Sequence, residues 1–400
     1  MIPRRNKIGN KEIWSRVLGY FFSKGKKHTD YISMFEEEVK SYLGVKHAAL
    51  TPTGRKGLTL ILDYYAFPKG SEILLPAYTL KDLVFLIKGM GYIPVFVDID
   101  ARTYNIDASL IENKITGKTR MIIATHIFGV PCEIDKIMEL ARKHNLIVME
   151  DCAHALGATY KGKCVGSFGD AAFFSLETSK PINTFGGGIT VTNDQGLSEY
   201  IKGKILGYPQ PKKELLIKVC SSMLEDAVIH SFLFAFLAFL FYSKWTKIVI
   251  TKIYLAFSKQ VNVNDFAYAN FQAYLGVLQL RQLDSKNKSM MEKIYKMRQL
   301  FQKQVSCQEG LGRSSCAFYY NIIKTEKSAE EMRKRLLFRG VDVGIKDEIT
   351  DNCPAYFNSN EAFPVANDCF EHLLQLPMTC KFNDEKAERI VRKVEESLGH

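Results

Sequence analysis

The nine cysteines of this 400-residue sequence are scattered, odd in number and without a CxxC pair. This pattern argues against a disulfide framework and against a zinc site, and it predicts reduced thiols in a cytoplasmic protein. The first residues include several lysines and arginines but no sustained apolar core, which is not the pattern of a secretory signal. Internal repeats and low-complexity tracts are also lacking, so a repeat architecture is not indicated.

Acidic residues are outnumbered, and the formal net charge is +11. A basic surplus is typical of proteins that bind nucleic acid, anionic lipid or phosphorylated small molecules. No nucleic-acid-binding motif is present and the charge is spread along the chain, so we expect no nucleic-acid partner. Hydrophobic residues make up 46% and charged residues 24% of the sequence, a composition typical of a globular protein long enough for two domains.

Short apolar runs alternate with helical patterns between about residues 45 and 195. Strands are predicted at 47–53, 72–78, 93–99, 120–128, 146–151, 170–176 and 188–194. Strands separated by helices form βαβ crossovers, so we predict an α/β fold with a mostly parallel central sheet covered on both faces. From about residue 284 the pattern becomes a helix–strand–helix mixture, which predicts a smaller C-terminal α+β domain.

An aspartate and a lysine stand at the ends of predicted strands. The strand LIVMED delivers Glu150 and Asp151 at its carboxyl end, where ligands bind in open α/β sheets. Lys180 closes the apolar stretch AAFFSLETSK and is followed by three glycines at 186–188. Taken singly, Asp151 could cap a following helix, and Lys180 and Ser175 could be solvated surface residues.

In combination, a strand-end aspartate, a Ser-x4-Lys and a glycine cluster form the set that pyridoxal phosphate needs. The lysine amine binds the cofactor aldehyde, and the aspartate holds the pyridine nitrogen protonated so that the ring accepts electrons. The serine and the backbone N–H groups at a helix start hold the phosphate. The amine must be neutral during the reaction, and apolar surroundings favour the neutral form.

Several separate blocks, in the right order, resemble the DegT/DnrJ/EryC1/StrS family of pyridoxal-phosphate-dependent sugar aminotransferases. They include MFEEEVKSYLGVKHAALTPTG, MEDCAHALGATYKGKCVGSFGD, FFSLETSKPINTFGGGITVTND and FQAYLGVLQLRQLD. The resemblance implies an aspartate-aminotransferase-like fold of type I, with a large cofactor domain at 1–262 and a linking helix plus small α+β domain at 263–400. It also implies a homodimer with active sites built from both subunits.

The resemblance assigns roles to particular residues. Lys180 matches the lysine that binds the cofactor and carries the proton, and Asp151 matches the partner of the pyridine nitrogen. His154 falls near the cofactor's 3′-oxygen, and Ser175 falls at a phosphate ligand. Related sugar dehydratases carry histidine in place of this lysine, so Lys180 favours transamination. No metal is implied.

The phosphate loop departs from the family pattern. Where the family has Ser-Gly-Thr, this sequence has Thr53-Gly54-Arg55. Arg55 could bind phosphate through its guanidinium. Alternatively, its side chain points elsewhere and only the backbone N–H groups of Gly54, Arg55 and Lys56 contribute.

Two further positions also depart from it. Leu80 stands where an aromatic residue commonly stacks on the cofactor ring, so either Leu80 packs on the ring or Tyr78 substitutes. An asparagine that family members supply to the partner subunit's phosphate has no clear counterpart, although Asn264 and Asp265 fall nearby. These changes bear on cofactor affinity and on the substrate.

A hydrophobic insert at about 212–258 contains AVIHSFLFAFLAFLFY at 227–242, sixteen residues without a formal charge. A helix of that length spans roughly 24 Å, short of the ~30 Å core of a bilayer, which argues against a full crossing. Two interpretations remain open: a helix packed in the dimer interface or against the large domain, and a peripheral contact of 227–257 with the inner face of a membrane.

The expected activity is transfer of an amino group from an amino acid, L-glutamate by family habit, to a nucleotide-linked keto-sugar. The product would be an amino sugar for glycan or lipid biosynthesis. Two alternatives stay open: lyase or dehydratase chemistry with the same cofactor, and a non-catalytic membrane-associated relative. The retained Lys180 and Asp151 favour catalysis.

Overall fold

The computed structural model describes residues 1–3, 13, 15–17, 19–20, 29–229, 266–301, 305–378 and 383–399. Asn264, Asp265 and most of the hydrophobic insert therefore lie outside the described residues, as does the predicted domain boundary at 262 and 263. No helix among the described residues is both long and apolar enough to cross a bilayer.

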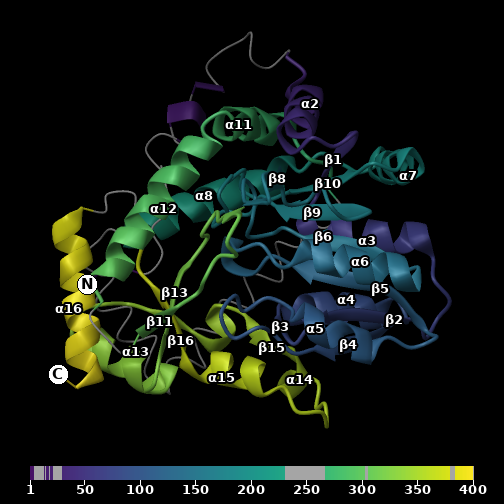
Figure 1. The fold of residues 1–400 in the computed structure, drawn as a ribbon. Coiled ribbons are helices and arrows are strands. Elements are labelled where there is room, and N and C mark those ends of the chain that lie inside the picture. The colour runs from purple at the N-terminus through teal and green to yellow at the C-terminus, as the bar shows by residue number, and fades with distance from the viewer. Residues whose placement is uncertain are drawn as a thin grey trace.

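A seven-stranded sheet forms the centre of the molecule (Figure 1). Its order is β1-β10-β9-β6-β5-β2-β4. Pairing is parallel from β9 through β6, β5 and β2 to β4, and antiparallel where β10 joins β9 and β1. The predicted mostly parallel α/β sheet is thus confirmed. The strands are β1 (His47–Thr51), β2 (Glu72–Pro76), β4 (Ile93–Val97), β5 (Thr119–Thr125), β6 (Ile147–Asp151), β9 (Ala171–Ser175) and β10 (Gly188–Thr192).

Helices cover both faces of this sheet, because alternate strand residues enter two separate cores. On one face, Leu74, Val148 and Phe174 pack with α2, α6 and α11. On the other face, Ile73 and Met149 pack with α3, α4 and α7. The helices are α2 (Tyr31–Leu43), α3 (Gly54–Tyr65), α4 (Lys81–Gly89), α5 (Ala108–Ile111), α6 (Ile134–His144), α7 (Gln195–Ile205) and α11 (Asn270–Leu280).

The C-terminal part builds a second, antiparallel sheet of order β11-β13-β16-β14 with its own core. The long helix α12 (Leu283–Gln299) leads into it from α11 (Figure 1). The strands are β11 (Val305–Cys307), β13 (Asn321–Thr325), β14 (Gly344–Ile345) and β16 (Leu373–Leu376). The helices are α13 (Ala329–Phe338), α14 (Cys353–Tyr356), α15 (Pro364–His372) and α16 (Asp384–Leu398).

Two small sheets join the N-terminal and C-terminal parts. Strand β3 (Tyr78–Thr79), just after β2, pairs with β15 (Asp351–Asn352). Strand β12 (Ser314–Ser315) pairs with β7 (Thr159–Tyr160), which in turn pairs with β8 (Lys163–Cys164). Residues from the second half of the chain therefore lie beside the strand ends of the central sheet.

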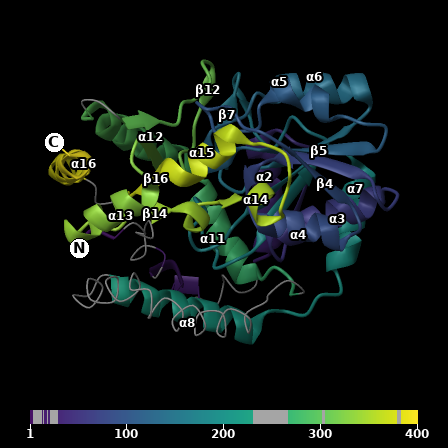
Figure 2. The ribbon, with the colours of Figure 1, turned by 90° about the horizontal axis from the view of Figure 1, so that it is seen from below.

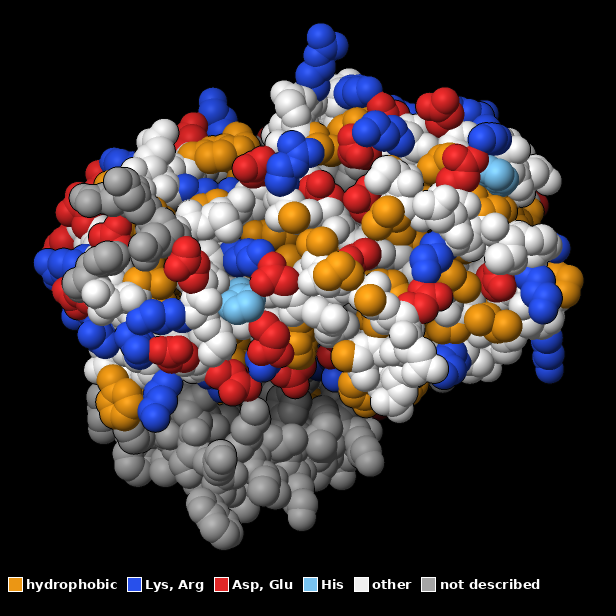
Figure 3. All heavy atoms as spheres, turned by 60° about the horizontal axis from the view of Figure 1, so that its bottom comes forward, with side chains coloured by type: hydrophobic (Ala, Val, Ile, Leu, Met, Phe, Trp, Pro, Cys, Tyr) orange, Lys and Arg blue, Asp and Glu red, His pale blue; other side chains and the backbone are white. Residues whose placement is uncertain are grey.

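Helix α8 (Lys212–Ile229) lies along the edge of the molecule, apart from the central layers (Figure 2). On the face of the protein shown in Figure 3, positive and negative side chains are interspersed rather than gathered into areas of one sign. This view agrees with the spread of charge along the sequence.

Candidate active site

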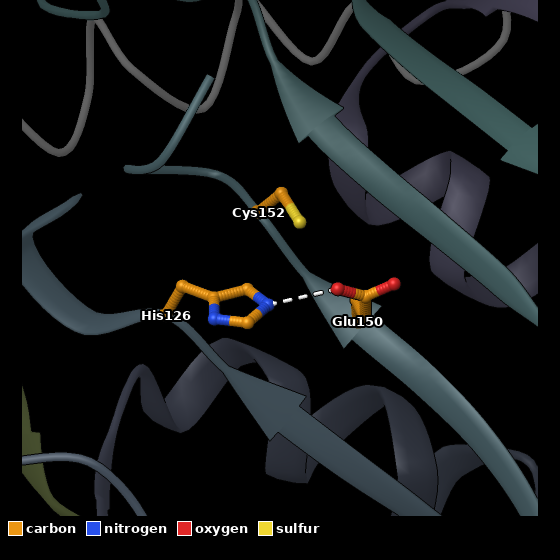
Figure 4. Close-up of side chains that lie close together, drawn as sticks. All are labelled: His126, Glu150 and Cys152. Carbon is orange, nitrogen blue, oxygen red and sulfur yellow. Dashed lines mark hydrogen bonds and ion pairs between the residues drawn. The ribbon is translucent and has the colours of Figure 1, made fainter. Parts of the chain in front are cut away.

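Strand β6 ends in two carboxylates that point to opposite faces of the sheet, because successive strand residues alternate. Glu150 has no exposed surface, and its carboxylate accepts N–H groups from Gly166 at 2.8 Å, Phe168 at 2.7 Å and Gly169 at 2.8 Å. The Nε2–H of His126 donates a fourth hydrogen bond at 3.0 Å (Figure 4). Burial alone would raise the pKa of Glu150, but the hydrogen bonds from His126, Gly169 and Gly166 hold it below its ordinary value.

His126, Glu150 and Cys152 place three ligand atoms within 4.8 Å of one another (Figure 4). Nδ1 of His126 accepts the N–H of Cys132 at 3.1 Å, so both ring nitrogens are already engaged. Burial raises the pKa of the Cys152 thiol to about 12, so it is protonated at neutral pH and is a poor metal ligand. We interpret this cluster as the support that holds β6, and not as a metal site.

Asp151 lies on the other side of β6 and is 5% exposed. Among the described residues, its carboxylate accepts one hydrogen bond, from the N–H of Ala153 at 3.0 Å. Burial raises the pKa of Asp151, and the positive charge of Lys180 offsets this only in part. The alternative that Asp151 caps a following helix is wrong, because residues 152–158 form turns. Within the part of the chain that the structure describes, this buried carboxylate therefore has no ion-pair partner in direct contact.

Lys180 lies in the loop between β9 and β10, where its N–H donates to the carbonyl of Glu177 at 2.9 Å. Burial lowers the pKa of its amine to about 8, while Asp151 and Glu177 act in the opposite direction. A neutral amine is thus accessible near physiological pH, which the surface-lysine interpretation would not give. Sequence reasoning had expected this effect from the apolar run before Lys180.

Tyr319 is a site residue that sequence reasoning missed. Its ring centre lies 4.5 Å from Nζ of Lys180 and 4.6 Å from the ring centre of His154, with the two rings nearly parallel. His154 is buried, and its Nδ1 accepts the N–H of Phe128 at 3.3 Å. Since Nδ1 is an acceptor, the neutral imidazole carries its proton on Nε2. Burial lowers the pKa of His154 well below its ordinary value and favours this neutral form.

Gly129 lets Tyr319 reach this position. The N–H of Tyr319 donates to the carbonyl of Phe128, and that of Ala317 to the carbonyl of Gly129, both at 2.9 Å. Gly129 has a φ of +87°, and a Cβ there would lie 2.8 Å from the nitrogen of Phe318. The sequence contained no local signal for this approach, because FYYNII indicated only a strand.

The start of α3 forms a cradle beside the ends of β9 and β10. Thr53 caps the helix by accepting the N–H of Lys56 at 3.0 Å, and the first N–H groups of a helix have no partner within it. Gly188 pairs with Ser175, and a Cβ on Gly188 would lie 2.4 Å from the nitrogen of Gly54. Gly54 and Ser175, predicted phosphate ligands, are therefore neighbours.

The side chain of Arg55 forms an ion pair with Asp82 of α4, and, besides burial, its positive charge also contributes to the lowered pKa of the Lys180 amine. The Nζ of Lys56 lies 5.3 Å from the ring centre of Tyr208. Both interpretations of Arg55, phosphate binding by the guanidinium and phosphate binding by backbone N–H groups alone, stay predictions.

Leu80 and Tyr78 lie at and just before the start of α4, the helix whose Asp82 pairs with Arg55. Leu80 precedes α4 and is 36% exposed, which leaves its side chain available at the surface. Tyr78 is 1% exposed and packs edge-on against Phe128, 6.2 Å between ring centres. Tyr78 thus belongs to the layer behind Phe128, while Tyr319 is the aromatic ring next to Lys180.

Solved sugar aminotransferases share this architecture. The aminotransferase PseC of Helicobacter pylori, involved in the biosynthesis of pseudoaminic acid, aligns with a TM-score of 0.76 over 99% of this chain and 98% of that chain, at 22% identity. The putative sugar aminotransferase Spr1654 of Streptococcus pneumoniae in its PMP form aligns with a TM-score of 0.75 over 99% of this chain and 98% of that chain, at 20% identity. At these identities the likeness shows the fold.

Sequence relatives are closer but cover less. The chain is 37% identical over 212 residues to GDP-perosamine synthase of Escherichia coli O157:H7, covering 50% of this chain and 58% of that protein. It is 40% identical over 220 residues to dTDP-3-amino-3,6-dideoxy-alpha-D-galactopyranose transaminase of Aneurinibacillus thermoaerophilus, covering 54% of this chain and 59% of that protein. The chain thus spans about half the length of the curated relatives it matches.

The family model matches nearly the whole chain. It covers residues 10–220 and 254–395, which include every predicted site residue and leave 221–253 unmatched. With the type I architecture in place and Lys180, Asp151 and the glycine cradle at the ends of its strands, the chain belongs to the DegT/DnrJ/EryC1/StrS aminotransferase family.

Proposed function

We propose that this chain is a pyridoxal-phosphate-dependent transaminase that moves an amino group from an amino acid to a nucleotide-linked keto-sugar. The observation that carries this proposal is the amine of Lys180, whose pKa is lowered to about 8, in electrostatic range of the buried Asp151. A nucleophilic amine and a carboxylate in need of a cation are the two groups that distinguish this chemistry from other uses of the same fold.

The residues present fit the cofactor at three points. Asp151 is a buried carboxylate that would pair with a protonated ring nitrogen. His154 offers an Nε2–H, because its Nδ1 is occupied by the N–H of Phe128. Ser175 and the N–H groups of Gly54 and Arg55 form a cradle for a phosphate at the start of α3. Pyridoxal phosphate, when bound, supplies an aldehyde that accepts amino groups and a ring that takes up electrons from the substrate.

Lys180 is the residue that moves the proton. Its amine, when neutral, removes the α-proton of the donor and later returns a proton to the sugar carbon that becomes aminated. A pKa of about 8 places both protonation states within reach at neutral pH. Tyr319 covers the amine from the side of the C-terminal sheet and limits its access to water.

The substrates are inferred from the relatives named above and from the family. A GDP-perosamine synthase and a dTDP-amino-sugar transaminase are among the similar proteins, which supports a nucleotide-linked sugar as acceptor. We propose L-glutamate as donor and a role in glycan or lipid biosynthesis. We further propose a homodimer, a large domain at 1–262 and a small domain with its linking helix at 263–400.

The test is an absorbance spectrum of the purified chain with added pyridoxal phosphate, beside Lys180→Ala, followed by L-glutamate. We expect a visible band that requires Lys180 and that glutamate bleaches. A Lys180-dependent band that glutamate and other amino acids leave unchanged, with turnover of a sugar nucleotide that needs no donor, would replace transamination by lyase chemistry. No band in the intact chain would overturn the proposed function.

A further inference from the structure

Helix α8 packs on the protein with a partly polar face. Lys218 forms an ion pair with Glu177 at 3.2 Å, and a Cβ on Gly186 would lie 2.7 Å from its Nζ. Ser222 and Asp226, one and two turns further along the same face, are 4% and 8% exposed. Leu215 and Val219 are the apolar part of this inner face and pack near Phe185 and Tyr274.

The opposite face of α8 is apolar and exposed. We call it the outward face of α8, and it consists of Leu216, Ile217, Cys220, Met223, Leu224 and Ala227, all exposed. At 100° per residue these positions fall within an arc of about 120°, on the side opposite to Lys218 and Ser222. Leu216 is 62% and Leu224 67% exposed. The helix therefore buries Ser222 and Asp226 and exposes this apolar face, which Ser221 and Glu225, also exposed, border on one side.

Elsewhere on the described chain, exposed large apolar residues form smaller groups, such as the pair Phe85 and Tyr356 with ring centres 5.8 Å apart. Of the thirteen found there, four lie on the outward face of α8. On the face shown in Figure 3, hydrophobic side chains stand singly or in small groups among charged ones. A contiguous apolar stripe is a mark of an interaction surface, whereas scattered apolar residues need no explanation.

We propose that the outward face of α8 binds the surface of an anionic membrane. The charged residues at the N-terminal end of this face are Lys212 and Lys213, both exposed. An apolar stripe with lysines at its end complements acyl chains together with anionic headgroups.

The sequence that follows α8 also combines apolar residues with lysines. It continues through an uncharged stretch to Lys244, Trp245 and Lys247, residue types that are enriched at membrane interfaces. Residues 221–253 also fall outside the family match. The surface proposed here nevertheless consists of α8 residues only.

The binding surface is connected to the active site through the inner face of α8. Lys218 holds Glu177, whose carbonyl accepts the N–H of Lys180 at 2.9 Å. A membrane on the outward face would therefore lie on the far side of α8 from the loop that carries the reactive amine. This arrangement suits an enzyme whose product is used at a membrane, although the membrane contact itself does not depend on the proposed reaction.

The experiment is co-sedimentation of the full chain with vesicles of phosphatidylcholine alone and of phosphatidylcholine with phosphatidylglycerol. We expect binding to the anionic vesicles that weakens as salt is raised. The double variant Leu216→Ser/Leu224→Ser should lower the vesicle-bound fraction at least fivefold. Phe338→Ser, which removes an equally exposed apolar residue from α13, should leave it unchanged. Lys212→Gln/Lys213→Gln should abolish the preference for anionic vesicles.

Light scattering and the cofactor absorbance band are measured on every variant. Equal vesicle binding by the intact chain and Leu216→Ser/Leu224→Ser, or no binding at all, overturns the proposal. A change in molecular mass without any vesicle binding would overturn it in favour of a contact with a second copy. The absorbance band reports the active site separately, so a failed membrane test and a failed function are distinguishable.

Discussion

Nζ of Lys180 lies 4.5 Å from the ring centre of Tyr319, although the two residues come from opposite halves of the chain. The contact brings together the loop between β9 and β10 and the approach to β13. An ammonium group above an aromatic face is stabilised by the ring quadrupole, whereas burial destabilises it. The protonation of the Lys180 amine therefore depends on residues from both halves of the chain.

The pH dependence of cofactor capture follows from the pKa of Lys180, which burial lowers to about 8. Only the neutral amine attacks the cofactor aldehyde. The rate of band formation should therefore rise about tenfold per pH unit below pH 8 and level off above it. Stopped-flow absorbance with the cofactor-free protein measures this profile. A rate that keeps rising up to pH 10 would show an amine that is not perturbed by its surroundings.

Replacing the aromatic ring should move that profile. Tyr319→Leu removes the attraction between ring and ammonium, which is worth about 0.5–1 kcal/mol, so the midpoint should fall by roughly half a pH unit. Tyr319→Phe keeps the ring and should leave the midpoint where it is. If both variants shift equally, the hydroxyl group, and not the ring, acts on Lys180.

Asp151→Asn should stabilise the cofactor-free protein and reduce the stability that the protein gains when the cofactor binds. The pKa of Asp151 is raised in the folded chain, so its favourable contribution exists at low pH and is lost as pH rises through the folded value. At pH 7 the charged side chain is a cost, and Asn should stabilise the cofactor-free protein by about 1 kcal/mol. With pyridoxal phosphate the variant should gain less stability than the intact chain. Thermal melts in both states test this pair of effects.

Gly129→Ala should destabilise the fold and push the segment at Phe318 and Tyr319 away from Gly129. A Cβ there would meet backbone nitrogens of Phe318 and Tyr319 at 2.8 and 2.9 Å, and the φ of +87° disfavours any side chain. We expect a loss of about 2–4 kcal/mol in the free energy of unfolding. Gly203→Ala is the matched control, because that helical glycine has nothing within 4 Å and should become slightly more stable. Similar losses in both variants would contradict the steric argument.

Glu150→Gln should destabilise the fold without touching the reacting groups. The carboxylate accepts hydrogen bonds from three backbone N–H groups and His126. The NH₂ group of a glutamine would face N–H donors there and could not accept their hydrogen bonds. The expected loss is about 3 kcal/mol in urea unfolding. Glu139→Gln, on the exposed side of α6, should change stability by less than about 0.5 kcal/mol. An equally stable Glu150→Gln would show that the charge is dispensable.

The central sheet was predictable because its strands are continuous apolar runs. Their ends were less so: the predicted strand at 47–53 stops at Thr51, since Thr53 is taken by the cap of α3. Lys180 and Asp151 could be proposed from the sequence because Asp151 ends a strand, Lys180 follows one, and together they resemble the cofactor-binding set of a known family. Tyr319 was missed because its place depends on the positive φ of Gly129 and on pairing across the chain.

The ion pair of Arg55 and Asp82 and the orientation of α8 were equally hidden from sequence reasoning. The two members of the pair lie on different helices, so nothing local relates them. In α8, polar residues at helical spacing would ordinarily be assigned to solvent. The contact of Lys218 with Glu177 and the packing of Leu215 and Val219 show that this face points inward.

The neighbouring carboxylates at the end of β6 also set a limit on how this protein can be altered. Glu150 belongs to the hydrogen-bonded support and Asp151 to the reactive side, and they are told apart only by strand alternation. Deleting or inserting one residue within β6, before Glu150, would move the side chain of Glu150 to the face that Asp151 now occupies, and that of Asp151 to the face of Glu150. Each carboxylate would then lack its present surroundings. Length changes suit the surface loops of this fold, whereas in β6 a single-residue insertion or deletion would disrupt both the hydrogen-bonded support and the proposed cofactor site.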